Sequence, residues 1–399
     1  MTSSPAQGCL SGLRVIEMGQ LIAGPFCGQL MGDMGADVIK VEPPGVGDPM
    51  RQWGRGPQKL WWEVIARNKH SVSANLRVAE GQALVRRLAA SADILIENFK
   101  PGTLERWGLG PDVMLKDNPR LIVVRISGYG QTGPYAHKAG FGGIAEALGG
   151  WRHIVGEPDR PPARMGISIG DTLAASFACM GALGALHSRS ISGRGQVVDM
   201  ALYEAVLQVM ESLIPEYDIS GEVRERSGSI LPGIAPSNVY PCRDGELMIA
   251  ANKDELFVRL AEAIGQPELA TDPYYTTHIA RGTHQAELDA IIAAWTRQQS
   301  VTDVAAMMDA AGIPAGPIYR APDMLEDAHF AAREAIAEVM TPRFGPVRMQ
   351  GCFPFLSATP STIRKAAPVQ VGEDNDAVYG GELGLAPSEL ADLKARGAI

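Results

Sequence analysis

The residues best suited to chemistry lie at the end of a glycine-containing run, Gly166–Asp171. Asp171 is followed by 17 residues, 172–188, that contain no Asp, Glu, Lys or Arg and are mostly apolar. This stretch predicts a buried helix that begins at Thr172, with one carboxylate directly before it. Unpaired backbone N–H groups and the helix dipole favour an anion at such a position. Because a partly desolvated carboxylate can attack an electrophile, we take Asp171 as the candidate catalytic nucleophile.

Two other interpretations of the same segment have to be weighed. An Asp directly before a helix is also a common helix cap, with no catalytic role. The run Gly166–Gly170 fits the G-x-S-x-G pattern of hydrolases, which would make Ser168 the nucleophile. That serine normally follows a buried strand, whereas residues 157–164 contain three prolines and are typical of a loop. The context therefore disfavours Ser168.

Composition limits the classes of protein that fit. The chain has 399 residues, enough for two domains, with 46% hydrophobic and 20% charged residues. A net charge of -9 disfavours a nucleic-acid partner. The five cysteines form no C-x-x-C pair and the seven histidines have no metal-ligand spacing, which disfavours disulfides and a metal site. The start of the chain does not resemble a secretory signal, and residues 172–188 are too short for a membrane span, so we expect a cytoplasmic protein.

The order of elements predicts an α/β fold. In the first half, short β-branched runs alternate with helical segments, which is typical of a doubly wound parallel sheet covered by helices. No dinucleotide fingerprint follows the first strand, and no P-loop occurs anywhere. The expected strands are Leu13–Glu17, Asp37–Glu42, Ser71–Leu76, Ile94–Glu97, Leu121–Ser127 and Gln196–Met200, and the expected helices lie near 24–34, 78–91, 141–148 and 172–187.

The second half differs in character. A linker is expected at Ser220–Ser229, where Gly, Arg, Glu and Ser cluster. Beyond it, a strand near Leu247–Ala251 and amphipathic helices near 253–264, 284–298 and 301–311 indicate a smaller α+β unit. The last segment carries too little apolar surface to stand alone and should rejoin the first domain. We therefore expect a large domain from 1–220 and 329–399, and a small domain from 221–328.

Three loops that bear cations, glycines or aromatic residues lie beside predicted strand ends. They are Asn68–Ser71, Glu97–Arg106 and Ser127–Pro134. Open parallel sheets bind their ligands at strand ends. The cations could pair with phosphates, while Phe99 or Tyr129 could stack on a base. Each loop alone is equally consistent with solvated charges and turn glycines, but together with Asp171 the loops favour an anionic ligand that carries a nucleotide.

Several motifs along nearly the whole chain resemble family III CoA-transferases, the family of formyl-CoA and carnitinyl-CoA transferases. The resemblance implies a Rossmann-like large domain built from both chain ends, a smaller middle domain, and a homodimer of two interlocked ring-shaped subunits. The motifs that carry it are Leu13–Glu17, Ala23–Pro25, Gly35–Glu42, Asn68–Ser71, Glu97–Gly102, Ser127–Pro134, Gly170–Asp171 and Gly193–Asp199.

The resemblance also implies a mechanism. The aspartate that matches Asp171 attacks the donor acyl-CoA thioester and forms a mixed anhydride and CoA thiolate. The thiolate returns to give an aspartyl-CoA thioester, which the acceptor acid resolves. A carboxylate that acts as both nucleophile and leaving group needs no metal or organic cofactor, so we expect none to be permanently bound. Coenzyme A enters as a thioester substrate.

The family's CoA-binding positions match five residues of this chain. By the resemblance, cations contact the CoA phosphates and the Asn-Phe pair lies near the pantetheine or the adenosine. Two positions depart from formyl-CoA transferase: Ile22 stands where that enzyme has a glutamine beside its active site, and Pro43 where it has a CoA-binding arginine. These departures disfavour formyl and oxalate chemistry. The five matching residues are Lys69, Asn98, Phe99, Arg106 and Lys138.

A further set of segments resembles the succinyl-CoA:dicarboxylate branch of the family. Its typical acceptors are itaconate, mesaconate, citramalate, malate and glutarate. Such an acceptor needs a cation for the carboxylate that does not react, and Arg51, Arg55, Arg152 or Arg164 could supply it. The segments are Leu60–Trp62, Phe141–Gly143, Gly149–His153, Asp159–Asp171 and Pro215–Asp218.

Two other functions remain as alternatives. An α-methylacyl-CoA racemase has the same fold and a matching aspartate, but abstracts a proton with a His and Asp pair. Its histidine should fall within Lys138–Phe141, where this chain has none. The second alternative is an inactive CoA-binding subunit that works only with a partner chain, and the presence of Asp171 argues against it.

Overall fold

The computed structural model describes residues 8–399 and divides the chain into two compact units. The large unit contains the chain up to Trp151, Met165–Ser212 and His329–Ile399, and the small unit contains Arg152–Arg164 and Leu213–Ala328. The division differs from the expected one in two places. The small unit begins at 213 rather than 221, and it includes the proline-containing segment 152–164.

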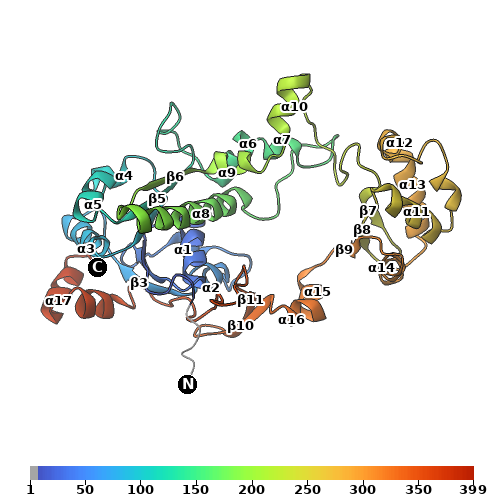
Figure 1. The fold of residues 1–399 in the computed structure, drawn as a ribbon. Coiled ribbons are helices and arrows are strands. Elements are labelled where there is room, and N and C mark those ends of the chain that lie inside the picture. Colours follow the sequence, from blue (N-terminus) through green and yellow to red (C-terminus); the bar gives the residue numbers. More distant parts are fainter. Residues whose placement is uncertain (1–7) are drawn as a thin grey trace. The chain divides into compact units, whose positions relative to one another are not determined.

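A six-stranded parallel sheet forms the centre of the large unit (Figure 1). Its strand order is β3-β2-β1-β4-β5-β6. The inner strands are almost completely buried, as expected for β-branched runs covered on both faces. The order reverses direction between β1 and β4. The strands are β1 Arg14–Glu17, β2 Asp37–Glu42, β3 Lys69–Ser73, β4 Ile94–Glu97, β5 Ile122–Ser127 and β6 Val197–Ala201.

Helices cover both faces of this sheet, each over its own apolar cluster. Side chains of α1, α6, α8 and α9 pack with Val15, Ile94 and Val124 on one face. Side chains of α3, the α4–α5 region and α17 pack with Ile16 and Leu95 on the other face. The helices are α1 Ala23–Asp33, α3 Ala79–Ala90, α4 Thr103–Arg106, α5 Pro111–Asp117, α6 Gly142–Leu148, α8 Ile169–Ser192, α9 Leu202–Gln208 and α17 Pro387–Ala395.

Shorter elements complete the large unit. An antiparallel hairpin, β10 Ile336–Thr341 with β11 Gly345–Gln350, belongs to the C-terminal segment. Two boundaries of the division along the chain fall inside the short helices α7 Trp151–Ile154 and α16 Ala328–Ala332. The remaining turns of helix are η1 Pro49–Gln52, α2 Trp61–Ile65 and the π-helical η3 Asp376–Glu382.

The small unit has its own three-stranded antiparallel sheet and its own apolar cluster. Its sheet has the order β7-β8-β9, formed by Ser237–Pro241, Glu246–Ala250 and Ala315–Pro317. Amphipathic helices pack on it through residues such as Phe257, Leu288 and Val304. The helices are α10 Leu213–Ser220, α11 Asp254–Ala263, η2 Pro267–Ala270, α12 His278–Thr283, α13 Gln285–Thr296, α14 Val301–Ala310 and α15 Ala321–Glu326.

The end of the chain is attached to the edge strand β3 by hydrogen bonds. The Ser71 backbone N–H donates to Asp374 Oδ2 at 2.7 Å, and the Ser73 N–H donates to Asn375 Oδ1 at 2.8 Å. The buried Tyr379 hydroxyl donates to the Ser73 carbonyl at 3.0 Å. These contacts place the C-terminal segment in the large unit.

Asn68 adds a second attachment just before β3. Its backbone has a φ of 60°, a left-handed conformation that asparagine tolerates better than most residues. Its side-chain oxygen accepts hydrogen bonds from the backbone N–H groups of Arg364 and Lys365. Its amide donates to Asp33 at 2.8 Å and to the Thr362 carbonyl at 2.9 Å. The motif that begins at Asn68 therefore has a structural role at the edge of the sheet.

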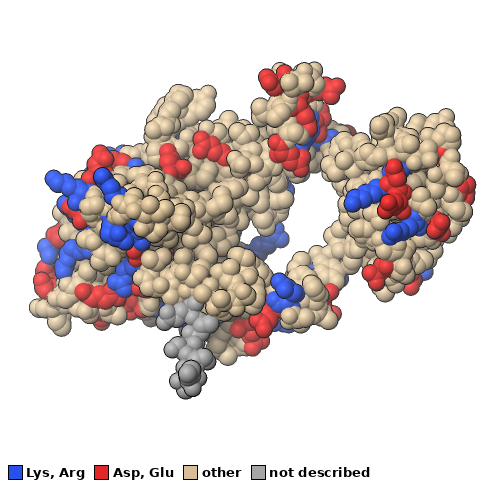
Figure 2. All heavy atoms as spheres, in the orientation of Figure 1, with Lys and Arg blue, Asp and Glu red and all other residues tan. Residues whose placement is uncertain are grey.

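Charges of both signs are interspersed on the visible surface of each unit, and most of that surface is uncharged (Figure 2). This face shows no broad basic field of the kind that binds nucleic acid.

Candidate active site

Asp171 lies inside the first turn of α8 rather than directly before the helix. The helix begins at Ile169 with Ser168 at the N-cap position, so Asp171 is the third helical residue. The expected start at Thr172 was therefore wrong, and Asp171 is not the N-cap. The position still favours an ionised carboxylate, because the N-terminal end of the helix dipole stabilises a negative charge in the first turn.

The rest of α8 supplies a buried apolar support for this carboxylate. Ala174, Ala175 and Ala178 are completely buried against α1 and the sheet. By length and composition α8 could also cross a membrane, but its buried face belongs to the core of the large unit.

Gly142 lies directly against the Asp171 carboxylate. A Cβ atom added to Gly142 would stand 2.1 Å from Asp171 Oδ2, which is far inside van der Waals contact. A Cβ added to Gly170 would stand 3.1 Å from the Gly142 carbonyl oxygen. The starts of α6 and α8 are thus packed backbone to backbone. The glycines allow this approach, and any side chain at 142 would displace the carboxylate.

Glu146 is a second carboxylate at the start of α8, and sequence reasoning missed it. It lies one helical turn after Gly142 on α6 and is 1% exposed. Its Cγ atom would be 3.4 Å from a Cβ added to Gly170. The i, i+4 spacing from Gly142 was the available signal, because it sets both residues on one helix face.

The strand order reverses between β1 and β4, and Asn98 lies at that point. Open α/β sheets bind ligands in the crevice beyond the carboxyl ends of such strands. The Asn98 side chain accepts a hydrogen bond from the Gln20 N–H at 2.7 Å and donates to the Gln20 carbonyl at 2.9 Å. Gly19 and Gly24 pack closely on the same side chain. Asn98 therefore links the loops that follow the two strands.

The segment after Asn98 presents an aromatic ring and a cation. Phe99 packs edge-on against Trp107, with ring centroids 5.2 Å apart. The Phe99 N–H donates to Glu97, a carboxyl whose pKa is raised by burial although Arg125 opposes this shift. Arg106 is exposed and donates to the Thr103 hydroxyl at 2.9 Å.

Lys138 projects from the loop that connects β5 with α6. Its ammonium lies 3.5 Å from the centroid of the Tyr135 ring and is exposed. Four residues further along the chain, at the start of α6, Gly142 lies against Asp171. Lys138, a candidate phosphate-binding cation, therefore lies four residues before the glycine that contacts the candidate nucleophile.

Lys69 does not fit the expected contact with a CoA phosphate. Its side chain is completely buried, and its ammonium contacts Glu17 Oε2 at 2.5 Å and the Pro25 carbonyl at 2.6 Å. Burial lowers the pKa of Lys69 although Glu17 opposes this shift. Because β3 begins at Lys69, the side chain enters the layer between the sheet and α1 and does not reach a loop at the carboxyl edge.

The same buried layer holds a second ion pair. The Lys40 ammonium lies 2.8 Å from both Glu17 and Asp48, and it donates to the Gly19 carbonyl. Burial opposes the charged form of Lys40, but the surrounding carboxylates raise its pKa above the ordinary value. The network fixes the loop after β1, which carries Gln20, the partner of Asn98.

Arg51 is also committed to a structural role. It pairs with Glu42 at 2.7 Å, donates to the Val369 carbonyl at 2.8 Å and stacks on the Trp62 ring. Its charge is therefore balanced inside the large unit. Within residues 8–399, no group of three or more His, Cys, Asp or Glu side chains could hold a metal ion.

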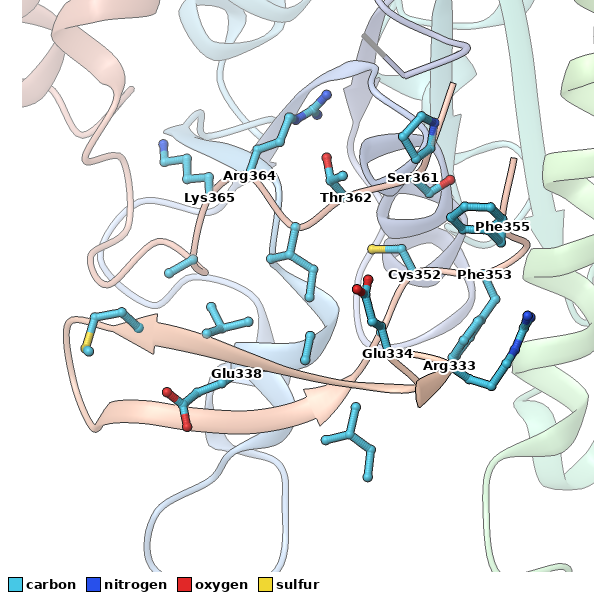
Figure 3. Close-up of a pocket in the computed structure, with 18 of the residues that line it drawn as sticks. Arg333, Glu334, Glu338, Cys352, Phe353, Phe355, Ser361, Thr362, Arg364 and Lys365 are labelled. Carbon is cyan, nitrogen blue, oxygen red and sulfur yellow. The ribbon is translucent and has the colours of Figure 1, made fainter. Parts of the chain in front are cut away.

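A pocket of about 960 Å³ lies between the β10–β11 hairpin and residues 352–366 (Figure 3). Glu334, Cys352 and Lys365 are among its lining residues. None of the six predicted site residues lines it. Its volume alone therefore does not connect it with the chemistry at Asp171.

Comparison with known proteins gives consistent matches. The family model described as CoA-transferase family III matches residues 10–375. The chain is 56% identical to a succinyl-CoA–D-citramalate CoA-transferase of Chloroflexus aurantiacus, over the full length of both proteins. It is 39% identical to the beta subunit of a succinyl-CoA–L-malate CoA-transferase of the same organism, covering 98% of each chain.

A bacterial relative and a solved structure extend these matches. A succinate–glutarate CoA-transferase of Agrobacterium fabrum is 38% identical, covering 81% of this chain and 83% of that protein. The crystal structure of a CAIB/BAIF family protein from Brucella suis superposes with a TM-score of 0.84 at 35% identity. That match covers 94% of this chain and 99% of the other.

Proposed function

Because the chain belongs to CoA-transferase family III, we propose that it transfers CoA from succinyl-CoA to a C4 or C5 dicarboxylate through covalent intermediates on Asp171. The protein is a CoA-transferase, and its substrates are CoA thioesters and carboxylic acids. The 56% identity over the full chain favours citramalate as the acceptor, with mesaconate, itaconate, malate and glutarate as further candidates. The observation that carries the proposal is the Asp171 carboxylate in the first turn of α8, packed against Gly142.

The proposed chemistry starts with attack of an Asp171 oxygen on the thioester carbonyl of succinyl-CoA. The C–S bond breaks, CoA leaves as a thiolate, and an aspartyl-succinyl anhydride remains. The thiolate then attacks the aspartyl carbonyl, which releases succinate and leaves an aspartyl-CoA thioester. The acceptor carboxylate attacks this carbonyl and expels the thiolate again. Attack of the thiolate on the acceptor carbonyl forms the new thioester and restores the Asp171 carboxylate.

The surroundings of Asp171 suit this sequence of steps. The apolar face of α8 limits access of water, which would hydrolyse an anhydride or an acyl thioester. Backbone N–H groups in the first turn of α8 could stabilise the oxyanion that forms during each attack, a contribution of roughly 3 kcal/mol per donor. The close approach of Gly142 restricts the positions that the carboxylate can occupy.

We propose that CoA is held by Arg106 and Lys138 at its phosphates and by the segment Asn98–Phe99 at the pantetheine or the adenosine. Both cations are exposed. Lys69 supports the site indirectly, through its ion pair with Glu17 beneath the loop after β1.

For the distal carboxylate of the acceptor, we propose Arg55, Arg152 or Arg164. Arg51 is set aside, because Glu42 and three backbone carbonyls already occupy its guanidinium. A guanidinium can bind a carboxylate through two parallel hydrogen bonds, which would select dicarboxylates over monocarboxylates.

We also propose a homodimer and a cytoplasmic location. The dimer is the family arrangement that the sequence motifs imply. All five cysteines lie in the described part of the chain and are free thiols, which is the state expected in a reducing compartment.

The covalent route is tested by trapping. Wild-type protein mixed with succinyl-CoA and borohydride or hydroxylamine should give a product modified at Asp171, detected by intact-mass and peptide mass spectrometry. Asp171→Ala should give no such product. Its transferase activity should fall by at least about 10⁴-fold, since a missing nucleophile cannot be replaced by binding interactions alone.

Asp159→Ala is the matched control for this experiment, because Asp159 is an exposed aspartate of the small unit. It should trap like the wild type. Full activity of a pure Asp171→Ala preparation would overturn the proposed role of Asp171 as the nucleophile.

A further inference from the structure

The ammonium of Lys138 is held by an aromatic ring rather than by a carboxylate. It lies 3.5 Å from the centroid of the Tyr135 ring, within the range of a cation–π interaction. Tyr129 packs against Tyr135 with ring centroids 5.9 Å apart and ring planes at 76°, an edge-to-face geometry. The three side chains form a stack in which Tyr129 supports Tyr135 and Tyr135 contacts Lys138.

The base of this stack is fixed to the sheet. A Cβ added to Gly128 would lie 3.0 Å from Gly140 Cα, so the two arms of the loop meet just beyond β5. A Cβ added to Gly140 would lie 3.0 Å from Tyr129 Cε2, so the inner ring packs on the glycine backbone. The Gln131 N–H donates to Asp199 on β6 at 3.0 Å. Tyr129 thus belongs to a loop that is restrained by its contacts with Gly140 and β6, whereas Tyr135 is 46% exposed.

The type of partner matters for a cation that has to bind phosphate. Lys40 and Lys69 pair with buried carboxylates, which neutralise their charges. Within the described chain, the Lys138 ammonium forms no ion pair, and the Tyr135 ring lies next to it. A ring face attracts an ammonium and restricts its position without neutralising it, so its N–H donors stay available to an anion.

On the basis of the proposed function, we infer that Tyr135 is a positioning residue for CoA, because its ring, braced by Tyr129, holds the Lys138 ammonium where a phosphate group of CoA binds. The ring restricts the rotamers of a long flexible side chain before the ligand arrives. Binding of the phosphate then costs less conformational entropy. Tyr135 itself need not touch the ligand.

The test compares CoA binding to three proteins by titration calorimetry. Tyr135→Leu should bind CoA about two- to fivefold more weakly than the wild type, the range expected for loss of an exposed cation–π contact. Tyr135→Phe should bind as the wild type does, because it keeps the ring and loses only the hydroxyl. In steady-state assays the KM for succinyl-CoA should rise by the same factor in Tyr135→Leu, while kcat stays within about twofold, as for loss of uniform binding.

A double-mutant cycle shows whether Tyr135 acts through Lys138. In a Lys138→Met background, Tyr135→Leu should weaken CoA binding no further. Tyr274→Leu is the matched control, since Tyr274 is an exposed tyrosine in an edge-on contact with His284, and no Lys or Arg among residues 8–399 stacks on its ring. It should leave CoA affinity unchanged.

Three results would overturn the role of Tyr135. The first is an unchanged CoA affinity in Tyr135→Leu, and the second is an equal loss of CoA affinity in Tyr135→Phe and Tyr135→Leu. The third is that Tyr135→Leu lowers CoA affinity by the same factor in the Lys138→Met background as in the wild type. If the wild-type protein binds no CoA, the proposed function fails as well. CoA binding that is unaffected by all Tyr135 variants overturns only the positioning role.

Discussion

At the residue scale, the site depends on the absence of a side chain at Gly142 as much as on the carboxylate of Asp171. Asp171 was identifiable because a single carboxylate precedes a long uncharged stretch. Its contact with Gly142, 29 positions earlier, could not be identified from the sequence, because the contact depends on how α6 packs on α8. Glu146 was overlooked for the same reason, since its spacing of four residues from Gly142 indicates a site only once Gly142 is known to contact Asp171.

Gly142→Ala should therefore abolish most of the activity while leaving the fold intact. The added methyl group would overlap the Asp171 carboxylate and displace it, and a displacement of about 1 Å can cost about 10²-fold in rate. The measurement is kcat/KM for succinyl-CoA together with the thermal midpoint of unfolding.

Gly381→Ala is the control for this substitution. Gly381 lies in η3 with nothing within 4 Å of its Cβ position, so alanine should leave both the stability and the rate close to those of the wild type. Wild-type activity in Gly142→Ala would contradict the close approach seen here.

At the element scale, most strands of the large sheet and the helices that cover it were predictable from β-branched runs and helical periodicity. Their observed ends differ from the expected ends by a few residues. The main error concerned β3, which begins at Lys69 rather than at Ser71. That shift moved Asn68 and Lys69 from an expected ligand loop into the framework of the sheet. The charged residues of the motif resembled ligand groups because their true partners, such as Glu17 and Asp374, are distant in sequence.

The attachment of the C-terminal segment to β3 should be sensitive to acid. Burial alone would raise the pKa of Asp374, but hydrogen bonds from His70, the Ser71 N–H and Lys365 lower it to about 2, below the ordinary 3.8. A carboxyl with a lowered native pKa stabilises the fold above its unfolded pKa. That contribution is lost as the pH falls from about 4 to about 2.

Asp374→Asn should thus lower the free energy of unfolding by roughly 1 kcal/mol at pH 7, after allowance for solvent screening, and should reduce its decline between pH 4 and pH 2. Urea titrations at several pH values measure both effects. Asp376→Asn serves as the control, because that carboxylate is exposed two residues away. Equal behaviour of the two variants would show that Asp374 makes no special contribution.

At the scale of the whole molecule, the large unit has an apolar cluster on each face of its sheet and the small unit has a cluster of its own. The division into two units is what a chain of 399 residues predicts. The return of the last segment to the large unit was foreseeable, because that segment has few apolar residues of its own. The assignment of residues 152–164 to the small unit could not be foreseen, since a proline-containing loop gives no periodic signal.

The large unit also exposes apolar side chains that a single chain leaves uncovered. Met180 and Ile191 on α8 are 60% and 76% exposed, and the edge strand β6 presents Val197. An uncovered apolar helix face beside an unpaired strand edge is typical of a subunit interface. We expect sedimentation equilibrium to give twice the mass of one chain at micromolar concentration. A stable monomer would contradict the proposed homodimer.

The hydrogen bond from Tyr379 to Ser73 joins residues 306 positions apart. A ribosome makes the chain from its N-terminus, so β3 leaves the exit tunnel long before Tyr379, Asn375 and Asp374 exist. The small unit, whose core comes mainly from one continuous stretch, can fold during that interval. In the large unit, in contrast, the edge of β3 stays uncovered until the C-terminal segment has been synthesised. During synthesis, therefore, the edge of β3 is open to pairing with other chains until the C-terminal segment covers it.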